Sequence, residues 1–428
     1  MQNFILIWFG QFISLIGSGL TSFALGIWVY QRTQSVTQLS FIYLFALLPA
    51  ILIAPLAGVL ADRCDRRIVM IVSDSVAGLN TLIIALLMSQ GWLNIWHIYL
   101  QITIDSVCYG FQLPAYAAAI PQLVPKKHFG RANGMIELSK AAGPLFSPLL
   151  AAMLMASIQI QGVILFDFVT FIFAQLTLII TRFPKLEKNN LKNAKNTNLL
   201  HDITFGFTYI LARPGFVLLV LFLAITNFSI GMTQVLITPM MLSFTNTQVL
   251  GIVLSIAGSG WLLGGILISL RGGFQRRIPI IITCKILIGL CTLLVGIAPN
   301  VILITAAGFV SFCCIPIVMS SNTTIWQTKV PSDVQGRVFA VKEMLTWSFL
   351  PLAYIVSGPI ADYIFEPLLT PSGALANTIG LLIGVGKGRG IGLIFILLGA
   401  FIMLVTVTAY QYPRLRLIED ELRDCIDD

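Results

Sequence analysis

The residue best suited to chemistry is Asp105, which stands near the middle of an apolar stretch over residues 95–120. An ionisable side chain inside a bilayer is costly and tends to be functional. Apolar surroundings disfavour the charged form of a carboxyl group, so Asp105 is a candidate for proton or substrate coupling. A second interpretation stays open, in which Asp105 is structural and is hydrogen-bonded to an amide such as that of Asn80.

A charge-dense segment over residues 58–70 separates two apolar stretches. Its small and charged positions include Gly58, Asp62, Arg63, Arg66 and Arg67. A glycine lets a neighbouring helix approach closely, and Asp62 could pair with a loop arginine or with the positive end of a helix. Such a cluster could hold one conformation and release another, which makes it a candidate conformational gate. The simpler interpretation is a topology signal alone, because short cytoplasmic loops are rich in basic residues.

Two further acidic residues, Glu137 and Glu343, occupy matching positions of an internal repeat, near the cytoplasmic ends of their apolar stretches. Basic residues accompany them at Lys140, Arg337 and Lys342. The spacing predicts local ion pairs or interfacial anchors, and the alternative is a second cytoplasmic gate. Asp167 is expected at an interface, nearer the external end of its stretch.

Polar and helix-distorting residues inside other apolar stretches complete the candidate set. The candidates for lining a cavity are Gln11, Asn80, Asn227 and Gln234. The stretch over residues 135–157 contains a glycine and two prolines, namely Gly143, Pro144 and Pro148. These residues predict a distorted helix, either as a packing kink or as a functional element.

The composition excludes an ordinary soluble domain. Of 428 residues, 57% are hydrophobic and only 10% are charged, with a mean hydropathy of +0.91. Such values are typical of a chain with many membrane spans. The net charge of +8 is expected to lie in cytoplasmic loops beside anionic lipid and not to bind nucleic acid. The sequence shows no metal-ligand cluster and no nucleophile arrangement, so we predict neither a cofactor nor an enzyme.

Apolar stretches long enough to cross a bilayer predict an all-α membrane protein with twelve transmembrane helices. They cover residues 4–30, 39–60, 68–88, 95–120, 135–157, 163–181, 216–239, 249–270, 278–297, 301–325, 339–360 and 391–410. Most of the 26 basic residues then fall on one side. The exceptions are Arg32, Lys387 and Arg389 on the other side, and Lys140 and Lys285 within spans. This asymmetry predicts that both termini are cytoplasmic.

The predicted spans divide into two six-helix bundles, residues 1–182 and 215–410. A polar linker over residues 183–214 separates them and ends in a short interfacial helix, and a cytoplasmic tail covers residues 411–428. The Val-Pro, Gly-Arg and Glu residues of 124–137 recur in 330–343 at one constant offset, as in transporters built from parallel repeats. The Gly-rich segment before residue 391 predicts an external turn with a short helix near residues 375–383.

The pattern Gly58-x-x-x-Asp62-Arg63-x-x-Arg66-Arg67 resembles the loop 2–3 signature of the major facilitator superfamily, with Asp65 in place of the loop glycine. Gly143-Pro144 resembles the start of the span-five Gly-Pro-x-x-Gly-Gly motif of the antiporters in that superfamily. Ser147 and Pro148 replace its trailing glycines. The span-four arginine motif of drug–proton antiporters is absent, and Asp105 lies in the comparable stretch.

The resemblance implies the major facilitator fold, with two pseudo-symmetric six-helix bundles, and it favours the branch of drug, macrolide and siderophore exporters. It further implies a monomeric secondary transporter in the inner cell membrane. This transporter would export a medium-sized amphipathic compound in exchange for protons, by alternating access. Two alternatives stay open: a lipid transporter of the same fold, for example one for lysophospholipids, and a polytopic membrane enzyme.

Overall fold

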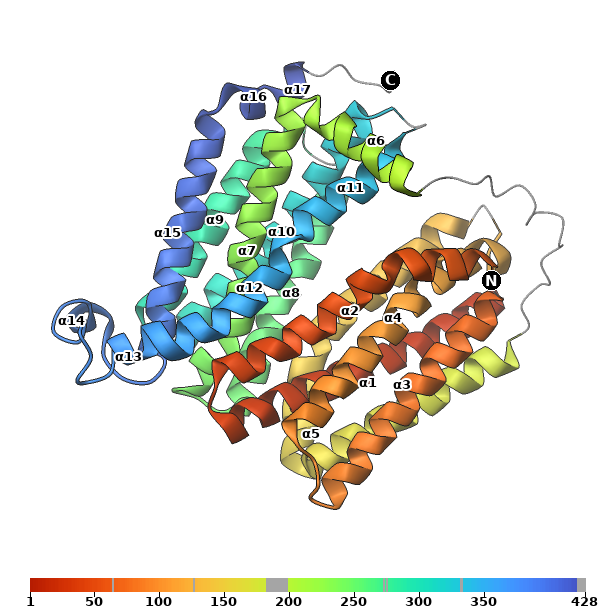
Figure 1. The fold of residues 1–428 in the computed structure, drawn as a ribbon, viewed down its shortest axis with the longest axis horizontal. Helices are drawn as coiled ribbons and strands as arrows, with labels where there is room; N and C mark the ends of the chain where they lie inside the picture. Colours follow the sequence, from red (N-terminus) through yellow and green to blue (C-terminus); the bar gives the residue numbers. More distant parts are fainter. Residues whose placement is uncertain are drawn as a thin grey trace. The chain divides into compact units, whose positions relative to one another are not determined.

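The structure is a computed structural model. It describes residues 1–63, 65–125, 128–181, 199–271, 274, 276–331 and 334–421, except for the side chains of residues 55, 58–63, 118, 121–122, 130, 133, 137, 140–141, 144, 199–203 and 420–421. The described chain is helical (Figure 1). Its contacts divide it into two compact units. Unit 1 comprises residues 1–193 and 246–255, and unit 2 comprises residues 194–245 and 256–428.

Unit 1 is built from five helices and the first residues of α8. These helices are α1 (Gln2–Thr33), α2 (Val36–Arg63), α3 (Arg66–Ser89), α4 (Ile95–Leu123) and α5 (Phe129–Ile180). α5 contains one residue with non-helical dihedral angles, Gln159, whose φ is +59°. This residue lies between two predicted spans, 135–157 and 163–181, so α5 combines both of them in one element. A positive φ is uncommon outside glycine, and nothing in the sequence marks the position.

Unit 2 contains the remaining helices (Figure 1). The long ones are α7 (Pro214–Leu242), α8 (Thr247–Arg271), α9 (Arg277–Ile297), α10 (Val301–Lys329) and α15 (Arg389–Gln411). The predicted span over residues 339–360 consists of α11 (Gln335–Trp347), α12 (Phe349–Pro359) and the π-helical turn η3 (Ile360–Phe365). The short helices are α6 (Leu199–Leu211), α13 (Glu366–Leu368), α14 (Ile379–Ile383), α16 (Pro413–Arg416) and α17 (Ile418–Glu421).

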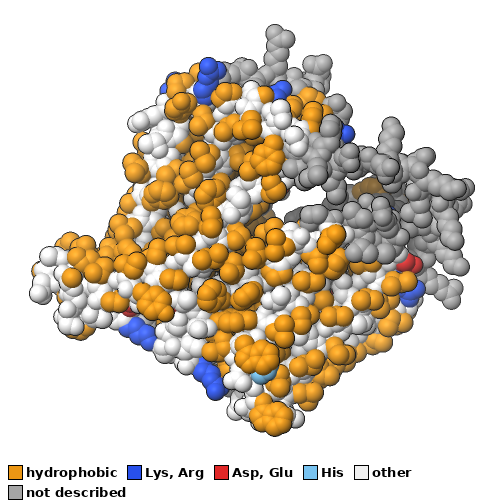
Figure 2. Space-filling view, in the orientation of Figure 1, with side chains coloured by type: hydrophobic (Ala, Val, Ile, Leu, Met, Phe, Trp, Pro, Cys, Tyr) orange, Lys and Arg blue, Asp and Glu red, His pale blue; other side chains and the backbone are white. Residues whose placement is uncertain are grey.

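Ten helices of the described chain are long and apolar enough to cross a membrane. The sequence predicts twelve spans, and the difference has two sources. The two halves of α5 are counted as one candidate, and α4 is not among the ten because Gln101, Asp105 and Gln112 lower its mean hydropathy. Hydrophobic side chains cover much of the visible surface of the helices (Figure 2), as expected for faces that contact lipid. The all-α membrane prediction is therefore confirmed.

Small residues let α1 pack directly against both halves of α5 in unit 1. A Cβ atom added to Gly10 would collide with Thr177 on the second half of α5. One added to Gly19 would collide with Ser147 on the first half. Small residues at helix interfaces are typical of membrane bundles, where close backbone contact replaces the hydrophobic effect as the source of stability.

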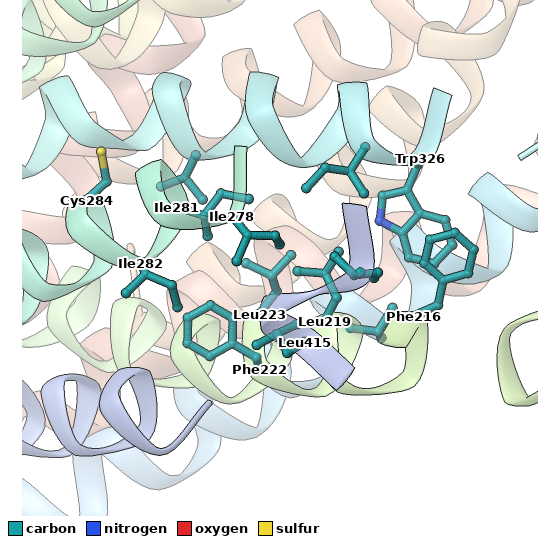
Figure 3. Close-up of a cluster of buried hydrophobic side chains, with 14 of the residues drawn as sticks. Phe216, Leu219, Phe222, Leu223, Ile278, Ile281, Ile282, Cys284, Trp326 and Leu415 are labelled. Carbon is teal, nitrogen blue, oxygen red and sulfur yellow. The ribbon is translucent and has the colours of Figure 1, made fainter. Parts of the chain in front are cut away.

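The core of unit 2 lies between α7, α9 and α10. The Phe216 and Trp326 rings stack at one end of this cluster, with 4.1 Å between centroids and 14° between planes, and both side chains are fully buried (Figure 3). Ile278, Ile281 and Leu219 belong to the same cluster. Aromatic stacking adds stability beyond that of the buried area. This pair therefore stabilises the packing of α7 against α10 in unit 2.

The segment between η3 and α15 is ordered by a carboxylate. Glu366 accepts hydrogen bonds at its two oxygens from the backbone amides of Gly388 and Ile391, each over 3.0 Å. The Arg389 guanidinium donates to the carbonyl oxygen of Ile383 over 2.8 Å. These bonds satisfy amides at the start of α15 and tie α14 to it. The short helix predicted near residues 375–383 is present as α14.

Glu366→Gln should loosen this segment, because the amide has one acceptor oxygen where the carboxylate has two, and no charge. A hydrogen bond to a charged group is worth about 1.5–3 kcal/mol. We therefore expect the amides of Gly388 and Ile391 to exchange with solvent at least about tenfold faster, measured by hydrogen–deuterium exchange in detergent micelles. Thr370→Val in the same segment is the control and should not change these amides. Equal protection in wild type and Glu366→Gln would show that the carboxylate does not order the segment.

Candidate functional site

Asp105 lies on α4 and receives two hydrogen bonds from primary amides. Its Oδ1 accepts from the side chain of Asn80 on α3 over 2.8 Å, and its Oδ2 accepts from Gln101, one turn earlier on α4, over 2.7 Å. Asn80 and Gln101 are buried, whereas Asp105 keeps partial exposure. The predicted partner amide, Asn80, is therefore confirmed. This bond does not decide between a structural and a coupling role, since a carboxyl group can use amide partners in either role.

A second carboxylate, Asp74 on α3, has the same kind of surroundings. Asp74 is 5% exposed. Its Oδ2 accepts from Gln11 of α1 over 2.8 Å and its Oδ1 accepts from Gln112 of α4 over 2.5 Å. Gln112 also donates to Oε1 of Gln11 over 2.8 Å. One carboxylate thus joins three helices of unit 1 through two glutamines.

Asp74 is not among the residues predicted from the sequence, although it is an aspartate inside an apolar stretch, the same signal that identifies Asp105. Gln11 is among the residues predicted to line a cavity. In the structure, Gln11 bonds to Asp74. The partnership could not be read from spacing, because Gln11, Asp74 and Gln112 are far apart in the chain and meet only through tertiary packing.

Asp167, on the second half of α5, is 1% exposed, so its side chain is packed inside unit 1. Ser18 of α1 donates to its Oδ1 over 3.4 Å. The burial follows from the close packing of α1 on α5. A Cβ atom at Gly17 would lie 2.8 Å from Oδ1 of Asp167, so the glycine makes room for the carboxylate.

The three carboxylates share one property: their described partners are neutral amides and hydroxyl groups. Within the part of unit 1 that the structure describes, none of Asp74, Asp105 and Asp167 forms an ion pair. A buried charge normally requires an opposite charge. A carboxyl group without a cationic partner can be neutralised by binding a proton, which is the chemistry that this arrangement allows.

The start of α3 is hydrogen-bonded to the C-terminal end of α5. Asp65 caps α3 by accepting from the backbone amide of Arg67 over 2.9 Å. The Arg67 guanidinium donates to the carbonyl oxygens of Leu178 over 3.1 Å and Ile179 over 2.6 Å. A cation is favoured at the carbonyl end of a helix. Of the predicted gate residues, the side chains of Gly58, Asp62 and Arg63 lie outside the described residues, and Arg66 begins α3.

The predicted antiporter-like motif lies on the first half of α5. Gly143 and Pro148 are buried, and the side chain of Pro144 lies outside the described residues. Ser147 donates to the carbonyl oxygen of Ile16 on α1 over 3.3 Å. The only non-helical dihedral angles within α5 are those of Gln159. The motif therefore contributes a packing surface against α1 without interrupting the backbone helix.

In unit 2, Glu343 is held by two neighbours on α11. Its Oε1 forms an ion pair with Lys342 over 2.6 Å, and its Oε2 accepts from the indole of Trp347 over 2.8 Å. The Glu343 side chain is 52% exposed and that of Lys342 is 5% exposed. The predicted local pair at Glu343 is confirmed. Its repeat counterpart at Glu137 and Lys140 lies outside the described side chains.

The remaining candidates in unit 2 bond to neighbouring helices. Arg337 lies over the ring of Phe205 on α6, 5.7 Å from its centroid. Asn227 on α7 is 9% exposed and donates to the carbonyl oxygen of Thr346 over 3.2 Å. Gln234, also on α7, accepts from the hydroxyl of Tyr354 over 2.8 Å.

Several buried cations of unit 2 are not among the predicted site residues, and Lys285 is the most buried of those described. Lys285 on α9 is 2% exposed, and its ammonium donates to the hydroxyl of Thr226 on α7 over 2.9 Å. Its position within a predicted span follows from the sequence, but no role does. Its described partner is a neutral side chain, as for the carboxylates of unit 1.

Membrane-length helices in two units, with buried carboxylates between helices of unit 1, define a polytopic membrane protein of the transporter class. A family model described as Major Facilitator Superfamily matches residues 7–353. The chain therefore belongs to the major facilitator superfamily, and it is a transporter of that superfamily. The resemblance and the fold expected from the sequence are both confirmed.

Similar proteins point to the same branch. The chain is 28% identical over 372 residues to macrolide efflux protein A of Streptococcus pyogenes, covering 85% of this chain and 90% of that protein. It is 22% identical to the multidrug efflux pump Tap of Mycolicibacterium fortuitum, covering 84% and 89%. The solved structure of a mutant of the nucleoside transporter NupG matches with a TM-score of 0.75 at 13% identity, over 95% of this chain and 100% of that one. The structural likeness shows the fold.

Proposed function

We propose that this protein exports a medium-sized amphipathic compound from the cell in exchange for protons. The observation that carries the proposal is the carboxylate of Asp105, which lies inside a membrane helix with amide partners and without an ion pair among the described residues. Such a group can be charged in one step of a cycle and neutral in another. The similarity to a macrolide efflux protein and to a multidrug efflux pump supports the direction of transport and the kind of substrate.

In this proposal the predicted bundles, residues 1–182 and 215–410, open alternately to the two sides of the inner membrane. Both termini are cytoplasmic, because most basic residues lie on that side of the predicted spans. The protein acts as a monomer, needs no cofactor, and takes its energy from the proton gradient.

Transport into everted membrane vesicles tests the proposal. In these vesicles, export appears as uptake, and an imposed proton gradient can be switched on or collapsed with a proton ionophore. We expect uptake of at least one compound from a panel of macrolides, siderophores and amphipathic peptides, and we expect loss of that uptake with the ionophore. Vesicles that lack the protein are the control. Uptake that continues after the gradient is collapsed would exclude proton exchange as the driving force.

A further inference from the structure

We propose that unit 1 binds two protons, one at Asp74 and one at Asp105, and that each carboxyl group keeps its amide partners in both protonation states because a terminal amide can turn. At Asp74 this turn gives up the hydrogen bond between Gln112 and Gln11. This inference rests on the proposed function, because it adds a second proton site to a proton-driven transporter. It assigns a role to Asp74, Gln11 and Gln112.

The two sites have the same construction. At each one, a single carboxyl group accepts one amide hydrogen bond at each of its two oxygens. Asn80 and Gln101 supply these bonds to Asp105, and Gln11 and Gln112 supply them to Asp74. Each site joins α3 to α4, so the same helix pair carries the arrangement twice.

A primary amide is the side chain that can follow a change of protonation. An ionised carboxylate only accepts hydrogen bonds, so it faces the NH2 end of each amide, as Asp74 faces Gln11 and Gln112. A protonated carboxyl group has one O–H donor, and a half-turn of one amide presents a carbonyl oxygen to accept it. An arginine or lysine partner has no acceptor and would favour the charged form alone. The amide partners therefore let each site bind or release a proton without moving a helix.

Gln101 provides a separate sign that the Asp105 site accommodates a change. Gln101 is 4% exposed, and its Oε1 is buried without a hydrogen-bond partner. A buried carbonyl oxygen without a donor is costly. When Asp105 is protonated, the carboxyl O–H becomes a donor that Oε1 of Gln101 could accept after the half-turn. The half-turn would give Oε1 of Gln101 a donor and would move its NH2 group to the position that Oε1 leaves.

The spacing keeps the two sites separate but on one surface. Asp105, Cys108 and Gln112 follow one another on the same face of α4. From Asp105 to Gln112 the helix rises by roughly 10 Å, which is two turns. The oxygens of Asp105 bond to Asn80 and Gln101, and those of Asp74 bond to Gln11 and Gln112, so the two carboxyl groups have separate partners and count as two binding sites.

Other titratable groups lie around these sites, and a test has to separate them. Cys108 on α4 interacts electrostatically with both Asp74 and Asp105, and Asp167 on α5 interacts with Asp105. Tyr116 follows Gln112 by one turn of α4. α1 contributes Gln11, which is uncharged. The side chains of Glu137 and Lys140 on α5 lie outside the described residues.

Infrared difference spectra of the purified full chain between acidic and alkaline pH test the two sites without any substrate. A protonated carboxyl group has a carbonyl band that an ionised one lacks. We expect Asp74→Asn to remove one such band and Asp105→Asn to remove another. Gln112→Leu should shift the Asp74 band only, and it also serves if Asp74→Asn does not fold. Asp65→Asn, which removes an exposed carboxylate outside the spans, should leave both bands. Identical spectra for wild type and Asp74→Asn would overturn the inference.

The number of protons exchanged per transported molecule gives a second test. It is derived from steady-state accumulation, measured with the membrane potential collapsed. At steady state, a gradient of about one pH unit supports roughly tenfold accumulation for one exchanged proton and roughly hundredfold for two. We expect wild type to follow the steeper relation and Asp74→Asn the shallower one. One-proton accumulation by wild type would overturn the second site and leave the proposed function standing. No gradient-driven accumulation at all would overturn the proposed function, while the infrared bands would still report on Asp74 and Asp105.

Discussion

Asp105→Asn is expected to lower gradient-driven accumulation of the exported compound by about tenfold per pH unit of gradient, while the protein stays folded. Asparagine has nearly the same shape as aspartate and can still bond to Asn80 and Gln101, which now surround Asp105. It cannot bind or release a proton, so the membrane side that the site faces no longer determines its charge. A gradient of about one pH unit would then lose the roughly tenfold accumulation that each exchanged proton supports. The measurement is steady-state uptake into everted vesicles.

A second assay separates lost coupling from lost binding. Exchange of labelled for unlabelled compound across the membrane needs alternating access but no net proton movement, so Asp105→Asn should retain exchange. Thr103→Val is the matched control on the same helix. The Thr103 hydroxyl bonds only within α4, to the carbonyl oxygen of Tyr99, and this variant should keep both activities. Full accumulation by Asp105→Asn would return Asp105 to a purely structural role.

The membrane architecture could be predicted because it depends on local properties of the chain. Apolar length alone marks most spans, and the basic residues mark the loops. The pairing of Asn80 with Asp105 could also be predicted. A carboxylate inside an apolar stretch requires a polar partner, and few amides lie in the neighbouring span. The break in the helix of the eleventh predicted span could not be predicted, because α11, α12 and η3 continue one apolar pattern.

The rest of the site depends on which helices meet, and no local pattern gives that. Asp74 obtains its partners from α1 and α4, at positions 11 and 112. Asp167 is buried because Gly17 lets α1 pack over it, whereas its sequence position near a span end indicates an interface. The burial of Asp167 thus depends on a small residue of the neighbouring helix, and the partners of Asp74 depend on which helices pack against α3.

The same dependence on small residues makes Gly399→Leu the most damaging substitution that we expect in unit 2. Gly399 on α15 faces the backbone of α9, where an added Cβ atom would collide with the amide nitrogen of Leu293 and come within 2.5 Å of the carbonyl oxygen of Gly289. Backbone atoms cannot move aside as a flexible side chain can. Overpacking a well-filled interface typically costs about 1–3 kcal/mol, and sometimes more. A whole leucine side chain at this contact would force α9 and α15 apart, so little folded protein should remain.

Monodispersity and thermal stability in detergent, measured by fluorescence-detected size-exclusion chromatography, test this expectation. Gly265→Leu on α8 is the matched control, since a Cβ atom there meets nothing within 4 Å. It should elute as wild type does. Gly399→Ala should be intermediate, because it adds only the colliding Cβ atom. If Gly399→Leu and Gly265→Leu were equally stable, α9 and α15 would not be in close backbone contact in the protein. α9 and α15 would then have to pack against each other through side chains.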